Sequence, residues 1–319
     1  MDILSDDQRV LIIGAGWIGR QVGLRMAICG LDVTFIDRVP AVLDDAQRWM
    51  QTQSPRYMET ILADAAKRAA DASTDCALPD GRRLKSPNIP ITQAAASQWA
   101  SRISFASSLD LVGESVSVVL ECVPEQITLK RRILRDVSSR FPKTTIIASN
   151  SSYFTPSALA QFVESPERFA NWHFHVPLDR SSIVDISGSP QTEGWVLDRL
   201  QGLTEQIDQY PLRLRHEHPG YVFNWLLQSL LRSALELVAA DVVDIADIDR
   251  AWKAVSGMPI GPFAMMDSIG LDVIEQVLAN ARWDDAEPVA INKLLAILRD
   301  PIAQGHLGVK TGRGFYVHP

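Results

Sequence analysis

Cysteine is scarce in this chain, and long apolar runs are missing. Cys29, Cys76 and Cys122 are spread over 319 residues and form no CxxC pair. Isolated thiols indicate reduced cysteines in a cytosolic protein rather than a disulfide framework or a zinc site. No apolar run reaches the roughly 18 residues of a membrane-spanning helix. The acidic N-terminal segment has no signal core or Arg-rich transit pattern, so we expect a cytoplasmic protein with no membrane partner.

An excess of basic residues is also lacking. The chain has 31 Lys and Arg against 38 Asp and Glu, a formal net charge of -7. A nucleic-acid binder needs a basic surface that contacts phosphates, so this balance argues against nucleic acid as a partner. Hydrophobic residues make up 46%, which is ordinary for a globular protein and excludes a disordered chain. The length favours two domains over one.

The first apolar run, residues 10–13, ends at a turn with the pattern GxGxxG. A helix-like stretch follows to Cys29, and a second strand-like run, residues 33–36, ends at Asp37. This order is typical of dinucleotide binding, because the glycines let the backbone approach a pyrophosphate at a helix N-terminus. The residues predicted to bind the cofactor here are Gly14, Gly16, Trp17, Ile18, Gly19 and Asp37.

Asp37 favours NAD over NADP. An acid at the end of the second strand accepts hydrogen bonds from a ribose 2′-hydroxyl and repels a 2′-phosphate. Arg38, directly after it, leaves NADP open as the minor alternative. For the whole turn, the alternative is a tight strand-to-helix connection with no ligand. For Trp17, the favoured interpretation is packing at the sheet edge.

Strands alternate with helices up to about residue 215, which predicts a Rossmann-type, doubly wound and mostly parallel sheet with helices on both faces. From Tyr221 onward the pattern is long, apolar and helical. We therefore expect an NAD-binding domain at residues 1–215 and an all-helical domain for substrate binding and dimerisation at 216–319. Besides the two strands already described, the predicted strands are 104–105, 117–120, 145–148, 183–186 and 210–214, with helices at 41–73 and 126–140.

Residues with catalytic chemistry are concentrated between positions 149 and 185. His173 lies in FANWHFHVP, and Asp185 follows it by twelve residues within an apolar strand. A charged Asp there is costly unless it is paired, and a nearby His is a natural partner. No metal is predicted, because metal-ligand spacing is missing among the remaining histidines, which are His175, His216, His218, His306 and His318.

Several motifs, in order, resemble the 3-hydroxyacyl-CoA dehydrogenase family over nearly the whole chain. The cofactor turn and Asp37 begin the series, and ECVPE with Lys130, SNSS and HF at 173–174 continue it. In the C-terminal part the matching motifs are PGY with Asn224, PIGPF with Asp267, GLD at 270–272 and LGVKTGRGFY at 307–316. Residues 121–130 are also similar to the L-gulonate 3-dehydrogenase and lambda-crystallin branch.

The resemblance implies a role for each matching residue. His173 is the general base and acid, Asp185 orients it, and Ser152 hydrogen-bonds the substrate oxygen. Asn224 helps to hold His173 and that oxygen. Glu125 and Lys130 contact the nicotinamide-side ribose. Asn150 and Lys310 complete the predicted cofactor-binding residues, with Lys310 near the phosphates.

Each role has an ordinary structural alternative. His173 can be a satisfied core histidine, and Asp185 a strand charge with an Arg partner. Ser152 can cap the helix after Pro156, although Thr155 is the better candidate. Asn224 can be a buried packing amide, and Lys310 a solvated loop charge. For Glu121, direct contact with the cofactor and a structural role are equally favoured.

Four positions depart from the family pattern, all near the predicted reacting centre. Asp185 replaces Glu, His175 an aromatic residue, Val176 an Asn and Tyr153 a Ser. Because the distal cofactor features remain, this distribution indicates the same redox chemistry with an altered acyl pocket.

Three functions remain in competition. The leading one is NAD-dependent, reversible oxidation of an L-3-hydroxyacyl-CoA. Basic residues near positions 67–85 are candidates to bind the CoA phosphates, and a solvated helix and loop face is at least as favoured an interpretation of them. The second is the same chemistry on a free 3-hydroxy acid, as in gulonate or carnitine dehydrogenases, or on a small keto ester. The third is a non-catalytic, crystallin-like protein. The candidate CoA residues are Lys67, Arg68, Arg82, Arg83 and Lys85, and those for a free carboxylate are Arg180, Ser181 and Ser182.

A homodimer is expected through the helical domain. Its first helix is rich in apolar residues, and one face should pack within the chain while another packs on a second copy. This expectation depends mainly on the family resemblance. The residues in question are Phe223, Leu226, Leu227, Leu230 and Leu231.

Overall fold

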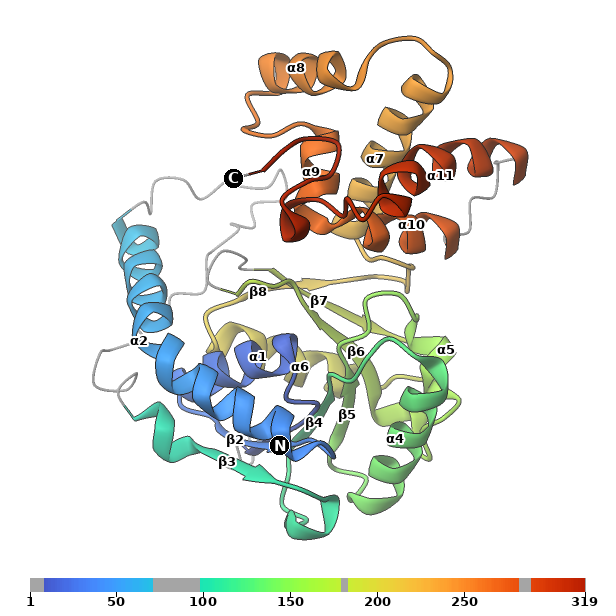
Figure 1. Ribbon diagram of the computed structural model, residues 1–319. Helices are drawn as coiled ribbons and strands as arrows, with labels where there is room; N and C mark the ends of the chain where they lie inside the picture. The colour runs from blue at the N-terminus through green and yellow to red at the C-terminus, as the bar shows by residue number, and fades with distance from the viewer. Residues whose placement is uncertain (1–8, 71–97, 179–182, 281–287, 319) are drawn as a thin grey trace. The chain divides into compact units, whose positions relative to one another are not determined.

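The structure is a computed structural model that describes residues 9–70, 98–178, 183–280 and 288–318 (Figure 1). The chain divides into two compact units, Met1–Tyr221 and Val222–Pro319. In the first unit, the described strands form an eight-stranded sheet in the order β3-β2-β1-β4-β5-β6-β7-β8. They are β1 (Arg9–Ile13), β2 (Asp32–Ile36), β3 (Ile103–Ala106), β4 (Val118–Glu121), β5 (Ile146–Ser149), β6 (Phe169–Phe174), β7 (Ile183–Gly188) and β8 (Tyr210–Arg213).

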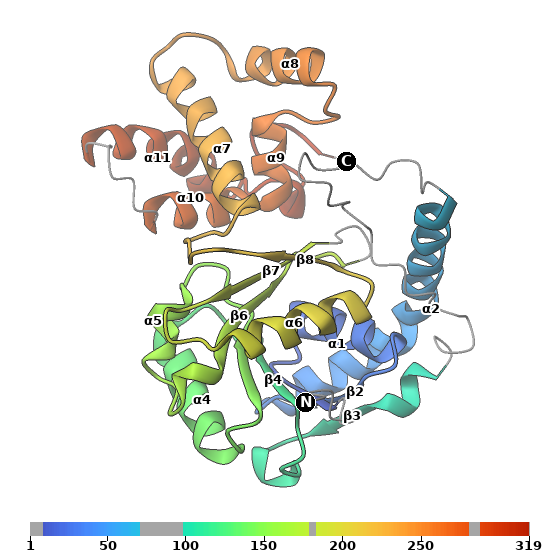
Figure 2. The same ribbon diagram turned by 180° about the vertical axis from the view of Figure 1, so that it is seen from behind.

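Helices cover both faces of this sheet, as Figures 1 and 2 show from opposite sides. Side chains alternate along β1, so Val10 and Ile12 join one core cluster while Leu11 and Ile13 join the other. The first cluster includes α1 (Trp17–Ile28), α2 (Pro40–Ala70) and α6 (Gly194–Gln206), and the second α4 (Ile127–Arg140) and α5 (Pro156–Ala160). The predicted doubly wound, mostly parallel sheet is confirmed.

Strand β6 was not among the predicted strands. Its sequence, FANWHF, is fully buried but includes the polar residues Asn171 and His173. It therefore shows neither the uninterrupted apolar run nor the apolar–polar alternation by which strands are predicted. It pairs with β5 in parallel and with β7 in antiparallel orientation. The antiparallel register sets His173 directly opposite Asp185, which is what brings the two predicted catalytic residues together.

The second unit is helical. Its helices are α7 (Phe223–Ala239), α8 (Ile245–Ser256), α9 (Pro262–Ile269), α10 (Leu271–Asn280) and α11 (Pro288–Ala303). The Asp249 carboxylate accepts the N–H groups of Phe263 and Ala264 at 2.9 and 3.0 Å, and so holds the start of α9. Asp267 accepts the N–H groups of Phe315 and Tyr316, both at 2.9 Å. Two buried aspartates thus give several residues of the C-terminal motifs a structural role.

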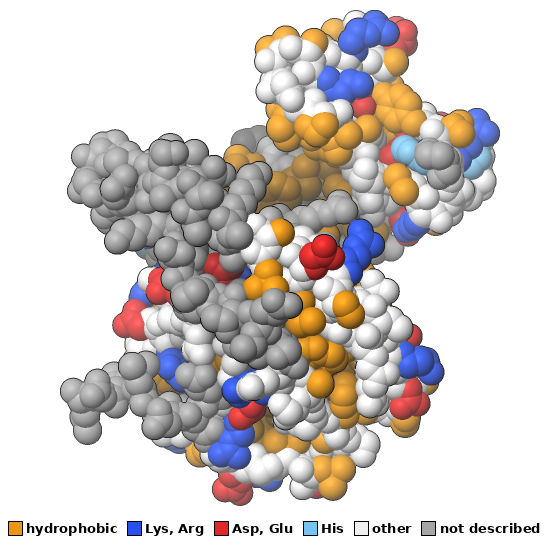
Figure 3. Space-filling model, turned by 90° about the vertical axis from the view of Figure 1, so that its left-hand side faces the viewer, with side chains coloured by type: hydrophobic (Ala, Val, Ile, Leu, Met, Phe, Trp, Pro, Cys, Tyr) orange, Lys and Arg blue, Asp and Glu red, His pale blue; other side chains and the backbone are white. Residues whose placement is uncertain are grey.

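Hydrophobic side chains are also present on the surface of the second unit (Figure 3). Of the residues proposed for dimerisation, Phe223 is 57% and Leu226 63% exposed, whereas Leu231 is buried in the unit's own core. None of the described helices is long and apolar enough to span a membrane.

Candidate active site and cofactor site

The turn between β1 and α1 is closely packed on one side and open on the other. Gly14 has φ +102°, and a Cβ there would lie 2.7 Å from the carbonyl oxygen of Cys122. A Cβ on Gly19 would lie 2.0 Å from the Gly14 oxygen, whereas one on Gly16 would meet nothing within 4 Å. Gly16 is also the N-cap of α1, where unpaired N–H groups and the helix dipole favour an anion. This arrangement fits the pyrophosphate of a dinucleotide.

Asp37 follows β2 and joins it to the glycine turn. Its carboxylate accepts the N–H of Ala15 at 3.2 Å and that of Val39 at 3.0 Å. The side chain is partly exposed, and a carboxylate has about four acceptor positions, so it retains capacity for ribose hydroxyls. The residues present therefore fit NAD.

Trp17 packs on α2. The side chain is 53% exposed, and its ring meets that of Trp49 edge-on at a centroid distance of 5.9 Å. The Arg20 guanidinium lies 5.1 Å from the Trp17 ring and 5.0 Å from the Trp49 ring, and it pairs with Asp45 at 2.7 Å. These contacts give Trp17 a packing role beside the cofactor turn.

A buried ion pair lies beneath the ends of β4 and β5. The Lys130 ammonium contacts the two carboxylate oxygens of Glu121 at 2.8 and 2.9 Å, and both side chains are essentially unexposed. Ser149 Oγ donates to Glu121 at 2.6 Å. Burial would lower the pKa of Lys130, but the charges of Glu121 and Glu125 outweigh it and raise that pKa. The charged groups of Glu121 and Lys130 therefore pair with each other inside the protein. Contact of Lys130 with the nicotinamide-side ribose stays a prediction.

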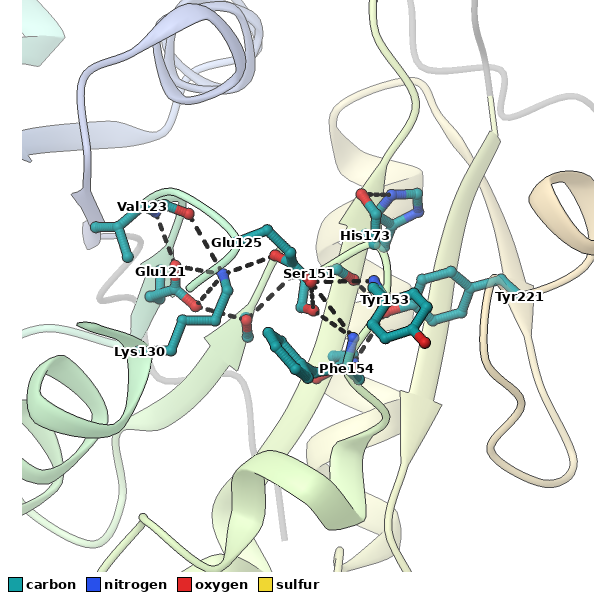
Figure 4. Close-up of polar contacts among 12 residues, drawn as sticks. Glu121, Val123, Glu125, Lys130, Ser151, Tyr153, Phe154, His173 and Tyr221 are labelled. Carbon is teal, nitrogen blue, oxygen red and sulfur yellow. Dashed lines mark hydrogen bonds and ion pairs between the residues drawn. The ribbon is translucent and has the colours of Figure 1, made fainter. Parts of the chain in front are cut away.

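Glu125 connects this pair to the loop after β5. One carboxylate oxygen lies 3.2 Å from the Lys130 ammonium. The other accepts the Ser151 hydroxyl and the backbone N–H groups of Tyr153 and Phe154, the latter two at 3.1 and 3.3 Å. Figure 4 shows these residues in a row from Glu121 to the loop. Glu125 thus holds the loop on both sides of residue 152, through the Ser151 side chain and the backbone of Tyr153 and Phe154.

His173 bridges this loop and β7. Its Nε2 lies 2.9 Å from Ser152 Oγ, and its Nδ1 lies 3.2 Å from Asp185 Oδ2. His173 is 4% exposed and Asp185 is 0% exposed. Burial lowers the pKa of His173 and outweighs the opposing hydrogen bond to Asp185. A neutral imidazole that donates from Nδ1 presents a lone pair at Nε2, so this arrangement can accept a proton there.

Three further residues surround His173, and of these only His175 was expected near the reacting centre. The Tyr221 ring stacks on the imidazole at a centroid distance of 4.6 Å, and its hydroxyl donates to the backbone carbonyl oxygen of Ser151 at 2.6 Å. Asn171 Nδ2 donates to that hydroxyl at 2.9 Å. His175 Nε2 lies 2.7 Å from the same Asp185 oxygen that His173 contacts. Two of them had a signal in the sequence, namely the position of Tyr221 in the PGY motif and the departure from the family pattern at His175, whereas Asn171 had none.

Asn150 has a structural contact. Its Oδ1 accepts the backbone N–H of Phe174 at 2.9 Å, which joins the end of β5 to the end of β6 beside His173. Thr155 is the N-cap of α5, so the capping alternative for Ser152 is not realised.

Comparison with known proteins decides the family. Residues 9–217 match the family model described as 3-hydroxyacyl-CoA dehydrogenase, NAD binding domain, and residues 220–318 match its C-terminal domain. The chain belongs to the 3-hydroxyacyl-CoA dehydrogenase family. It is accordingly an NAD-dependent oxidoreductase of the 3-hydroxyacyl-CoA dehydrogenase type that acts on a CH–OH group, which confirms the resemblance, the cofactor and the enzyme class.

Individual relatives of this dehydrogenase are distant but cover nearly its whole length. The mitochondrial hydroxyacyl-coenzyme A dehydrogenase of Rattus norvegicus is 26% identical over 97% of this chain and 90% of its own. The 5-formyl-3-hydroxy-2-methylpyridine 4-carboxylate 5-dehydrogenase of Mesorhizobium japonicum is 27% identical over 98% and 91%. Among solved structures, (S)-3-hydroxybutyryl-CoA dehydrogenase of Ralstonia eutropha has a TM-score of 0.79 and 26% identity, covering 98% of this chain and 99% of its own.

Two predicted site residues of this dehydrogenase lie in the second unit. Asn224, in the first turn of α7, is partly buried. The Lys310 ammonium pairs with Asp272, and this hydrogen bond lowers the pKa of Asp272. Their approach to His173 and to the cofactor stays a prediction. The proposed substrate-binding groups lie outside the described residues or side chains, namely Lys67, Arg68, Arg82, Arg83, Lys85, Arg180, Ser181 and Ser182.

Proposed function

We propose that this enzyme oxidises the 3-hydroxyl of an L-3-hydroxyacyl-CoA to the 3-oxoacyl-CoA, reversibly, with His173 as general base and acid. The observation that carries the proposal is the position of His173, whose two ring nitrogens contact Ser152 and Asp185. A base that is held at one nitrogen and open toward a polar loop at the other suits proton transfer to and from an alcohol.

Each residue has a distinct part in the proton transfer. Ser152 Oγ hydrogen-bonds the substrate oxygen and holds it near His173 Nε2. His173 takes the hydroxyl proton at Nε2 during oxidation and returns it during reduction. Asp185 accepts the Nδ1–H, fixes the tautomer and stabilises the imidazolium while it carries the proton. Bound NAD supplies the hydride acceptor for oxidation and, as NADH, the hydride donor for reduction.

Residues around the catalytic histidine keep this geometry in place. Glu125 holds the loop that carries Ser152, and the Lys130–Glu121 pair holds Glu125. Tyr221 covers one face of the imidazole and excludes water from it. A merely structural or crystallin-like protein needs none of these contacts around an ionisable histidine, which weighs against the non-catalytic alternative.

A free acid is the second candidate substrate. The departures at Asp185, His175, Val176 and Tyr153 favour it, because they change the surroundings of the reacting carbon and leave the cofactor turn unchanged. A relative of similar identity is named for a pyridine carboxylate substrate. In this case one or two groups near residues 180–182 anchor the carboxylate.

A substrate panel separates the two candidates. NADH formation is measured with L-3-hydroxybutyryl-CoA beside L-gulonate, L-carnitine and free L-3-hydroxybutyrate. We expect turnover with the thioester and at least tenfold lower kcat/KM with the free acids. Turnover with a free acid alone would contradict the thioester proposal and make Arg180→Ala the next variant. No turnover with any hydroxy substrate, together with intact NAD binding, would favour the non-catalytic alternative.

We also propose a cytoplasmic homodimer that acts in fatty acid metabolism. The exposed Phe223 and Leu226 on α7 offer apolar surface for contact with a second copy. Light scattering of the whole chain tests this point, and a monomer at micromolar concentration would contradict it.

A further inference from the structure

We propose that His175 is a positioning residue for the proton transfer, which holds Asp185 from a second side and so limits how strongly Asp185 stabilises the protonated form of His173. The inference deepens the proposed function and rests on the proposed role of His173 in it. It concerns a position that departs from the family pattern.

Both histidines contact the same carboxylate oxygen. Asp185 Oδ2 lies 2.7 Å from His175 Nε2 and 3.2 Å from His173 Nδ1. The two imidazoles meet edge to face at a centroid distance of 4.7 Å. Asp185 Oδ1 is buried and has no hydrogen-bond partner among the described residues, so Oδ2 receives both donors. The shorter of the two contacts belongs to His175, not to the proposed catalytic histidine.

The contact distances fit hydrogen bonds better than metal coordination. His173, His175 and Asp185 offer three ligand atoms within 4.8 Å of one another. In a tetrahedral zinc site with bonds of about 2.1 Å, neighbouring ligand atoms lie about 3.4 Å apart. The spacing of 2.7 Å between His175 Nε2 and Asp185 Oδ2 is too short for that and is ordinary for N–H···O⁻. We therefore treat the cluster as a shared carboxylate.

Sharing has a definite direction of effect. A second N–H donor stabilises the ionised carboxylate, so Asp185 gains less when His173 becomes charged. A proton on His175 would also repel one on His173 at this distance. Both effects favour neutral His173, and the hydrogen bonds from the two histidines lower the pKa of Asp185 although burial opposes this.

Other groups around His173 act in known directions. Glu125, on the neighbouring loop, favours the protonated imidazole, although the Lys130 ammonium beside it offsets part of that charge. Tyr221 stacks on the ring, and burial raises the pKa of its hydroxyl, so it stays neutral. Ser152 is uncharged. Among the described groups near His173, His175 is thus the one that can oppose the pull of Asp185.

A pair of variants isolates the hydrogen bond. His175→Phe removes the donor and keeps a ring of similar size, whereas His175→Gln keeps an N–H near the position of Nε2. The acid limb of kcat/KM for oxidation reports the ionisation of the free enzyme's base. We expect His175→Phe to move this limb to higher pH by about 0.5–1 unit, which is about a three- to tenfold loss on the acidic side. In His175→Gln the acid limb should stay close to its wild-type position.

A measurement that needs no turnover separates this inference from the proposed function. Imidazole nitrogen chemical shifts of His173 are titrated by NMR in the full-length wild type and both variants, with His173→Gln to assign the signal. The expected result is an upward shift of the His173 midpoint in His175→Phe alone. If the NMR midpoint moves but the rate profile does not, the shared carboxylate is supported and His173 is not the base.

Equal His173 midpoints in the wild type and His175→Phe, with the variant folded by circular dichroism, would overturn the inference. A shift of the same size in His175→Gln would overturn it too, because loss of the donor could not then be the cause. If His175→Phe does not fold, His175→Leu, which also lacks the donor, is titrated in its place under the same criteria.

Discussion

The cofactor turn and the acid–base site are built in different ways, although both lie in the first unit. In the turn, the site is formed by backbone conformation and by the absence of Cβ atoms at its glycines, within six consecutive residues. At the acid–base site, side chains from β6, β7 and the loop after β5 meet through strand register. The departures that the family resemblance implies all fall in the second region. A backbone-built site tolerates few changes, whereas a side-chain network accepts a different side chain wherever its hydrogen bonds are still made.

The strongest test of this contrast is His173→Gln. Loss of the base should lower kcat by about 10²–10⁴-fold, because general acid–base catalysis contributes that much. NAD affinity, measured by calorimetry, should change little, since the cofactor turn does not depend on His173. Retained turnover would remove His173 from the mechanism, and loss of NAD binding would mean that the two regions are not independent.

Gly14→Ala should have the opposite pattern. A Cβ there would lie 2.7 Å from the Cys122 oxygen at a φ of +102°, so either the turn or β4 must move. We expect NAD binding to weaken at least tenfold and the midpoint of thermal unfolding to fall. Gly30→Ala is the matched control, because Gly30 has φ +93° and a Cβ there would meet nothing within 4 Å. It should cost about 1–2 kcal/mol of stability and leave NAD binding intact. Equal loss of binding in both variants would contradict the packing argument.

Asp37→Ser should have the smallest effect. Removing the carboxylate removes hydrogen bonds to a ribose and the repulsion of a 2′-phosphate, so the ratio of kcat/KM for NAD over NADP should fall by about tenfold. Proton transfer should be unaffected, which an unchanged acid limb of the pH profile would show. An unchanged cofactor ratio would mean that Asp37 serves only to join β2 to the glycine turn.

Local patterns were sufficient for one of these regions and not for the other. The glycine turn, its strand and helix, and Asp37 could be predicted because a few neighbouring residues specify that conformation. Strand β6 could not be predicted, because it is buried on both faces yet contains Asn171 and His173, and its sequence shows no periodic signal. The roles of Glu121 and Lys130 were equally hidden, because nine residues of sequence separation do not reveal that their charged groups meet in the core.

The sequence by itself determined the fold class, the family, NAD as cofactor, and His173 and Asp185 as a candidate pair. Those conclusions rest on residue types and spacings that survive without coordinates. Only the tertiary structure decided that Asp185 serves two histidines through one oxygen, that Tyr221 covers His173, and that Glu125 and Lys130 support the loop of Ser152. The physical reason is that hydrogen bonds depend on tenths of an ångström between residues far apart in the chain, and those distances are set by strand register and by the packing of loops and helices against the sheet.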